Sequence, residues 1–389
     1  MIKIKRKLKK ILMEASHEVT NAALNIEEVD IQIPRKKDFG DFSSNIAMKL
    51  AGKVNMNPLE LANKINNRLI DRYDFIEDIR VMGSGFINFY IKKESLIKEH
   101  LKMIEDRDFK ELEIDKKNIK ISIILERSRN ILTLQGFRVF MNMYYLGNIY
   151  SFAGYKVRRI VLIKDYDDDL SIKYLMSNFK DVEVTLDEEE LRDSITFCSS
   201  LAQGLFTNID GRRFIVEGVR IYRNGIEVYN PTLIDVINGL GIDRIKYTLA
   251  NEVLTNEAVI ELTRDNLRYI QYPYSRIGSI IKLLKKEGID VENIGEFNEK
   301  LINVLENELL KKMADFKTVI MDSINQNQPY RLIKYVNELS EIFYRINSST
   351  LFRQLSHERL RTLLKLLSNL KILIEEILTI LEVPVYERM

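Results

Sequence analysis

The chain contains one cysteine, three histidines and no tryptophan among its 389 residues. A single cysteine cannot build the disulfide framework of a small secreted protein. So few histidine and cysteine side chains also argue against an ordinary zinc site, and we predict neither a metal nor a cofactor. This use of cysteine is typical of a reducing compartment, so we expect the protein in the cytoplasm.

Long hydrophobic runs are also missing. In the basic N-terminal stretch MIKIKRKLKKILMEASHEV, charges interrupt each apolar segment before it reaches the length of a signal-peptide core or a membrane span, so we expect no membrane partner. Apolar residues recur there at helical spacing, which predicts an amphipathic helix with a basic end. That end is either a solvated helix terminus or a contact to RNA phosphate or another anionic surface.

Neither sign of charge dominates the composition. The 59 basic and 57 acidic side chains leave a formal net charge of +2. No global field therefore attracts polyanions, and any nucleic-acid surface has to be a local patch. Hydrophobic residues make up 46% of the chain, which is enough for two or three packed domains.

The patterning changes twice along the chain and predicts a multidomain α+β fold. Residues 1–110 have the pattern of a small α/β domain, with strands at 29–33 and 85–91 and a helix that begins at Asn57-Pro58. Residues 111–235 contain apolar strands at 119–125 and 157–163 separated by a helix-length segment, which predicts a reduced Rossmann-like βαβ region. Strand signals fade from about Pro231, and residues 236–389 are predicted to form an all-α helical bundle.

Short motifs in a fixed order resemble the two ends of a known enzyme family. FGDFSSNIA at residues 39–47 and GSGFINF at residues 83–89 resemble the N-terminal domain of arginyl-tRNA synthetases. YIQYPYSR at residues 269–276 resembles the signature that opens their anticodon-binding helical domain, the DALR type, and the ending VYERM is similar to their C-termini. LGIDRIKY at 240–247 and AGYKV at 153–157 also fit, so the resemblance spans nearly the whole chain.

The resemblance implies that both ends of the chain contact transfer RNA, most simply an arginine-type tRNA. The implied tRNA-binding residues are Phe86, Asn88, Tyr269, Gln271, Tyr272, Arg276, Tyr386, Arg388 and Met389. Several of them have a structural alternative. Phe86 and Phe89 are expected in the core of a strand, and Asn88, opposite in parity, is expected on its exposed face. Tyr272 and Arg276 share a helical face and could instead serve core packing or a surface ion pair.

The residues for aminoacylation chemistry are missing where the resemblance places them. TLQG at 133–136 stands where the family has a His-x-Gly-His motif, which stabilises charge developing on ATP phosphates at a helix N-terminus. Residues 125–130 lack the family's Ser-Pro-Asn and Lys-Pro elements, and YRNG at 222–225 keeps only an arginine and a glycine of its second catalytic loop. Fewer than seventy residues lie between Ile163 and Pro231, too few for the second half of a full catalytic domain.

Two other features could suggest chemistry, and both have simpler explanations. Asp165, Asp167, Asp168 and Asp169 follow a predicted strand and could hold Mg²⁺, but such a run is more typical of a solvated turn and helix cap. Cys198 has no histidine nearby in sequence and is predicted to be a buried structural thiol. We therefore assign no catalytic residue.

Three functions remain open from the sequence. The first is a tRNA-binding protein without aminoacylation activity, an adaptor or regulator that works with a tRNA-modifying enzyme or with the true synthetase. The second is an enzyme that uses tRNA or ATP through a rebuilt remnant site, such as residual arginine–tRNA ligase chemistry. The third is a protein-interaction module that has lost RNA binding.

Overall fold

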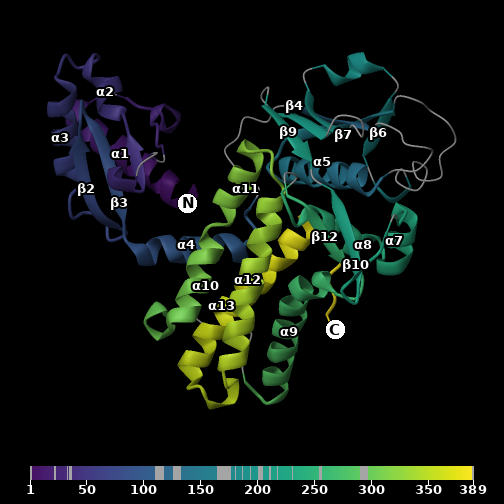
Figure 1. Ribbon diagram of the computed structural model, residues 1–389. Helices are drawn as coiled ribbons and strands as arrows, with labels where there is room; N and C mark the ends of the chain where they lie inside the picture. The colour runs from purple at the N-terminus through teal and green to yellow at the C-terminus, as the bar shows by residue number, and fades with distance from the viewer. Residues whose placement is uncertain are drawn as a thin grey trace. The chain divides into compact units, whose positions relative to one another are not determined.

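The computed structural model describes the chain apart from residues 1, 22, 33, 35–36, 110–117, 126–132, 164–176, 180, 186, 193, 200–204, 210–211, 217, 230, 254–255, 290–296 and 388–389. The described residues form two compact units, residues 1–106 and 107–389. Each unit is mixed α and β in Figure 1 and is described by itself. In the described parts of both units, no helix is long and apolar enough to cross a membrane.

The first unit packs helices against a three-stranded antiparallel sheet of order β1-β3-β2 (Figure 1). Its elements are α1 (Ile2–Thr20), the 3₁₀ turns Ile26–Glu28 and Lys37–Phe39, β1 (Phe42–Ser44), α2 (Ile46–Ala51), α3 (Pro58–Leu69), β2 (Ile76–Met82), β3 (Phe86–Ile91) and α4 (Lys93–Glu105). The apolar stripe of α1 joins the core through Ile4, Leu8 and Leu12. The predicted start of α3 is confirmed, because the Asn57 side chain accepts hydrogen bonds from the Leu59 and Glu60 N–H groups.

One predicted strand of this unit is wrong. Among the described residues of 29–33, only Gln32 pairs, as an isolated bridge to Ser43. The alternating pattern there instead places Val29 and Ile31 in the core from an irregular segment. β1 and β2 were not predicted, because β1 has three residues and the apolar residues of β2 do not alternate strictly with polar ones.

The second unit begins with a six-stranded sheet of order β6-β5-β4-β7-β8-β9, in which β6, β5, β4 and β7 are parallel. Its elements are β4 (Asn118–Leu125), α5 (Leu134–Phe152), β5 (Lys156–Ile163), β6 (Val182–Thr185), the 3₁₀ turn Glu188–Leu191, β7 (Ser194–Ser199), β8 (Leu205–Ile209) and β9 (Arg212–Val216). The predicted βαβ unit is confirmed, since α5 connects two parallel neighbours. α5 lies along the sheet in Figure 1 and is buried along most of its length.

A second, small sheet of order β11-β10-β12 follows. It contains β10 (Val219–Arg223), β11 (Ile226–Glu227) and β12 (Ala258–Glu261). In the chain, the helices α7 (Leu233–Leu240) and α8 (Ile242–Ala250) come between β11 and β12. β12 was not predicted. It pairs in parallel with β10, so one strand of this pair precedes residue 235 and the other follows it. The domain boundary at residue 235 stays a prediction.

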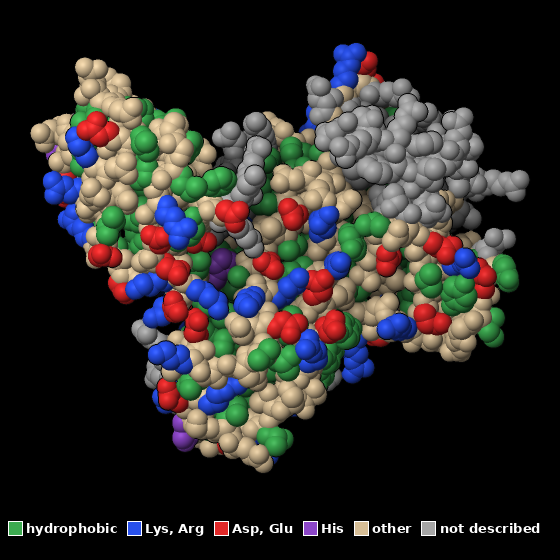
Figure 2. Space-filling model, turned by 60° about the vertical axis from the view of Figure 1, so that its left-hand side comes forward, with side chains coloured by type: hydrophobic (Ala, Val, Ile, Leu, Met, Phe, Trp, Pro, Cys, Tyr) green, Lys and Arg blue, Asp and Glu red, His purple; other side chains and the backbone are tan. Residues whose placement is uncertain are grey.

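The rest of the second unit is helical, as predicted. It contains α9 (Asn266–Lys286), the 3₁₀ turn Glu299–Leu301, α10 (Val304–Ala314), α11 (Phe316–Asn325), α12 (Tyr330–Ser349), the 3₁₀ turn Phe352–Gln354 and α13 (His357–Ile380). α9, α10, α12 and α13 run alongside one another in Figure 1. The leucine-rich stripe predicted for the last helix is buried from Leu360 in α13 to Leu381, the residue that follows the helix. On the face shown in Figure 2, basic and acidic side chains alternate over these helices, which agrees with the balanced composition.

Candidate nucleic-acid interface

The GFIN segment of the first unit forms the start of β3, the central strand of its sheet. Phe86 is 40% exposed at the strand's first position, so the expectation that it is a core residue is wrong, while Phe89 is fully buried as predicted. Asn88 is only 2% exposed, which corrects the expectation that it lies on an open face. Its Oδ1 accepts a hydrogen bond from Ser43 Oγ at 2.6 Å.

The failure of the parity argument for Asn88 has a local cause. The strand has neighbours on both sides, with Ser43 and Arg80 as register partners of Asn88. The Arg80 guanidinium lies over the Tyr90 ring at 4.5 Å and pairs with Asp78 at 2.6 Å. A register partner on each neighbouring strand, and the hydrogen bond from Ser43, accompany the burial of Asn88.

In the second unit, three tyrosines form a stack between α9 and α12. The centroid of the Tyr344 ring lies 4.8 Å from that of Tyr269 and 5.4 Å from that of Tyr272, and the planes of the latter pair are nearly parallel, at 2°. Burial raises the pKa of the Tyr344 phenol to about 12. Tyr344 was missed in the sequence because it lies 75 residues from Tyr269, and no local pattern links the two positions.

A proline inside α9 explains why Tyr344 is held there. Pro273 has no N–H, so the carbonyl of Tyr269, four residues earlier, lacks its usual helical donor. The Tyr344 hydroxyl donates to that carbonyl at 3.2 Å. One helical turn further along α9, exposed Arg276 donates from Nε to Asn347 Oδ1 of α12 at 3.2 Å.

The C-terminal tail, defined here as residues 383–387, lies along α9. Gln271, which is 4% exposed, donates from Nε2 to the Pro384 carbonyl at 2.7 Å. Ser275 Oγ donates to the Tyr386 carbonyl, and Lys282 pairs with Glu387. Gln271 thus binds the tail through this hydrogen bond, while Tyr386 is 49% exposed. Arg388 and Met389 lie outside the described residues.

At the Rossmann-like sheet, α5 begins where the resemblance places the histidine motif. Thr133 is the residue before the helix, and its Oγ1 accepts a hydrogen bond from the Gly136 N–H at 3.0 Å. A helix start of ordinary type therefore occupies the position. The acidic run at 165–169 and the segment 126–132 lie outside the described residues, as does the side chain of Cys198 in β7.

The YRNG motif forms the turn between β10 and β11. Asn224 and Gly225 both have positive φ, 53° and 76°, which turns successive N–H groups toward one point. That point is occupied by the Glu261 carboxylate, which accepts from the two N–H groups at 3.0 and 3.1 Å. Hydrogen bonds from Thr263, Gly225 and Asn224 lower the pKa of Glu261 to about 2.

Two family models match the two ends of the chain. "Arginyl tRNA synthetase N terminal domain" matches residues 3–91, and "DALR anticodon binding domain" matches residues 270–389. A small α+β domain, a Rossmann-like sheet and an anticodon-binding helical domain define a protein of the aminoacyl-tRNA synthetase class.

Similar proteins narrow this class. An arginine–tRNA ligase of Desulforamulus reducens is 27% identical over 267 residues, which is 65% of this chain and 46% of the relative. An arginine–tRNA ligase of Staphylococcus epidermidis is 24% identical over 497 aligned positions that cover 86% of this chain and 90% of the relative. The solved arginyl-tRNA synthetase of Plasmodium falciparum shares the fold, with a TM-score of 0.52, 14% identity and 99% coverage of both chains. The chain belongs to the arginyl-tRNA synthetase family.

The chain is shorter than such relatives. It spans about half the length of the Desulforamulus enzyme that it matches. The alignment with the Staphylococcus enzyme runs over 497 positions, more than the 389 residues of this chain, so it includes long gaps here. This agrees with the short sequence between β5 and α7.

Proposed function

We propose that this protein binds tRNA, most simply an arginine-type tRNA, and does not aminoacylate it. Capping of α5 by Thr133 is the observation that carries the proposal. The first N–H groups of that helix are where the resemblance places ATP-facing histidines, and here a threonine–glycine hydrogen bond takes their place. Each lost transition-state contact of this kind reduces a rate by about two to three powers of ten.

The turn at Asn224 and Gly225 supports the same proposal. Its N–H groups are of the kind that bind anions, but an internal carboxylate already accepts from both. A phosphate would have to displace Glu261, whose low pKa keeps it charged at neutral pH. The two segments that the resemblance connects with ATP are therefore both engaged in hydrogen bonds of the chain itself.

The features that favour RNA lie in the two terminal regions. Phe86 at the start of β3, the Tyr269–Tyr344–Tyr272 stack and Tyr386 on the tail give aromatic surface on which unpaired bases could stack. Arg276 and Arg388 would contact phosphates. In this role the protein is an adaptor or regulator that presents tRNA to a modifying enzyme or to the true synthetase.

The test measures chemistry and binding on one preparation. Arginine, ATP and tRNA are supplied together, and arginine-dependent pyrophosphate exchange and charged tRNA are measured, while tRNA binding is followed by filter retention. We expect binding without either product. Charging that persists after contaminating synthetase has been removed would overturn the loss of activity. Absence of tRNA binding at low salt would overturn the adaptor role, and sequencing of co-purified RNA would identify the tRNA.

A further inference from the structure

The chain contains two Asn-Gly dipeptides, Asn224-Gly225 and Asn238-Gly239. In such a pair the glycine nitrogen can attack the asparagine side-chain amide, because glycine has no side chain to hinder the approach. All four residues are exposed, so water has access to both pairs. Whether either pair reacts therefore depends on how the fold holds the glycine N–H.

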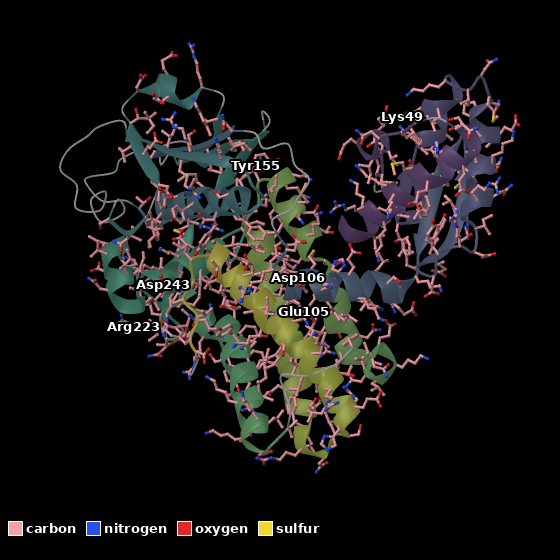
Figure 3. The ribbon with its side chains drawn as sticks, turned by 180° about the vertical axis from the view of Figure 1, so that it is seen from behind. Lys49, Glu105, Asp106, Tyr155, Arg223 and Asp243 are labelled. Atoms are coloured by element: carbon pink, nitrogen blue, oxygen red, sulfur yellow. The ribbon has the colours of Figure 1, made fainter. Side chains whose placement is uncertain are left out.

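The two pairs lie in different local structures. Asn238-Gly239 is in the last turn of α7, where the glycine N–H belongs to the hydrogen-bond ladder of the helix. Asn224-Gly225 is the turn between β10 and β11, directly after Arg223, which is labelled in Figure 3. Here the Gly225 N–H donates to Glu261 Oε2 at 3.1 Å. A carboxylate from outside the turn thus provides the acceptor that the helix provides at the other pair.

The pairing of β12 with β10 holds Glu261 beside this turn. The parallel register places Glu261 opposite Tyr222, and the Leu262 N–H donates to the Tyr222 carbonyl at 2.8 Å. Thr263 fixes the carboxylate, because its N–H and its hydroxyl donate to Oε1 at 3.1 and 2.7 Å. With a pKa of about 2, Glu261 is a weak base at neutral pH, so it holds the proton on the Gly225 nitrogen rather than removing it.

We propose that Asn224 is a deamidation site of this chain and that Glu261 controls its rate by holding the Gly225 N–H. In the reaction, the Gly225 nitrogen loses its proton to solvent and forms a bond to Cγ of Asn224, and the side-chain nitrogen leaves as ammonia. Water then opens the cyclic imide to aspartate or isoaspartate. The reaction requires no RNA, so the inference is independent of the proposed function.

The product would change the turn itself. Deamidation adds a second carboxylate close to that of Glu261, and like charges at short range repel each other. The Gly225 N–H would then lose its acceptor. Hydrogen exchange at this amide should therefore be faster in Asn224→Asp, which carries the side chain of the product, than in the wild-type protein. The reaction would act as a one-way switch of the turn, driven by water.

The test follows deamidation of the full-length protein by mass spectrometry during incubation at mildly alkaline pH. Cleavage after glutamate places the two pairs on separate peptides, since Glu227 lies between them. We expect Glu261→Ala to speed the reaction at Asn224 about 10-fold, the effect of losing one hydrogen bond to a charged group, and to leave Asn238 unchanged. Glu261→Gln keeps an acceptor without the charge and should give a smaller acceleration at the same site.

Glu257→Ala is the matched control, because Glu257 is an exposed acid just before β12 whose carboxylate accepts from Arg220 at 2.7 Å. It should leave both rates unchanged. An unchanged rate at Asn224 in Glu261→Ala would overturn the proposal. A slower reaction there would also overturn it, because Glu261 would then act as a base. Equal acceleration of both pairs in the two Glu261 variants would reflect a general loosening of the fold and would refute control by the Gly225 hydrogen bond.

Discussion

Neighbouring residues of α9 make different contacts, although they belong to one sequence motif. Gln271 is buried and bonded to the tail, whereas Tyr272 one position later stacks on Tyr344 of α12. Successive positions of a helix lie about 100° apart, so a motif of consecutive residues necessarily faces several surroundings. The two roles can be separated by substitution.

Replacing Gln271 with leucine should destabilise the protein by about 1–3 kcal/mol, because the partly buried Pro384 carbonyl loses its donor while the volume of the buried side chain is nearly kept. Urea unfolding measures the change. Gln354→Leu is the control, since Gln354 is exposed and should change stability by less than about 0.5 kcal/mol. Equal effects of the two substitutions would mean that the Gln271 hydrogen bond contributes nothing.

Tyr344 should show its burial in alkaline titration. Its pKa is raised from 10.0 to about 12, so the folded protein holds this proton over a range where the unfolded chain releases it. The stability due to the neutral phenol is complete below pH 10.0 and is lost as the pH rises toward about 12. Phenolate absorbance is measured against pH for the wild-type protein and for Tyr344→Phe, and the difference between the two curves is the titration of Tyr344. Its midpoint should lie near pH 12. A midpoint at the ordinary value would contradict the packing.

Among the helices and strands, the sequence predicted those that are specified by a pattern of residues close together in the chain. The βαβ unit, α13 and the start of α3 were right because a long apolar period or a capping pair specifies each one. β12 was missed because its four residues are specified by pairing with β10, 39 positions earlier. Segment 29–33 was wrong because burial in an irregular chain also produces alternation.

For the candidate site, the sequence supplied aromatic and basic candidates but not their partners. Tyr344 is held by a carbonyl that Pro273 leaves without a donor, and Gln271 is held by a tail more than a hundred positions away. Such contacts depend on the packing of α9 against α12 and α13. Asn88 shows the same limit within a sheet, because its hydrogen bond with Ser43 depends on the pairing of β1 with β3, which the parity of its position does not reveal.

The packing of α5 on β5 can be tested at Gly147. A Cβ there would lie 2.4 Å from Arg159 Nε, and Arg159 is buried and bonded to Asn148 at 2.6 Å, so it cannot easily move aside. We expect Gly147→Ala to destabilise by about 1–3 kcal/mol through overpacking, despite the better helix propensity of alanine. The measurement is chemical denaturation.

Gly239 of α7 provides the matched control for that substitution. It also lies in a helix, but no atom is within 4 Å of its added Cβ. Gly239→Ala should therefore stabilise by up to about 1 kcal/mol. If Gly147→Ala raised stability as much as Gly239→Ala does, the close approach of Arg159 to α5 would be refuted.

At the scale of the whole molecule, balanced charge and RNA binding have to be reconciled. A net charge of +2 gives little long-range attraction, so affinity must come from local contacts. The exposed basic residues of α1, such as Arg6 and Lys10, are one local source. A solvated helix end and a phosphate contact look alike in the structure, but they differ in their response to salt.

The salt dependence of RNA binding therefore distinguishes the two possibilities. If phosphates are neutralised on binding, the logarithm of the association constant should fall linearly with the logarithm of salt concentration, by about 0.7–0.9 for each phosphate. If α1 contacts the RNA backbone, Arg6→Gln should reduce the magnitude of that slope by the amount due to about one phosphate. Lys64→Gln, which removes an exposed charge paired with Glu60 on α3 instead, should leave it unchanged. An unchanged slope in Arg6→Gln would mean that the basic end of α1 is only solvated. Affinity that does not depend on salt in the wild-type protein would favour a protein-interaction module over RNA binding.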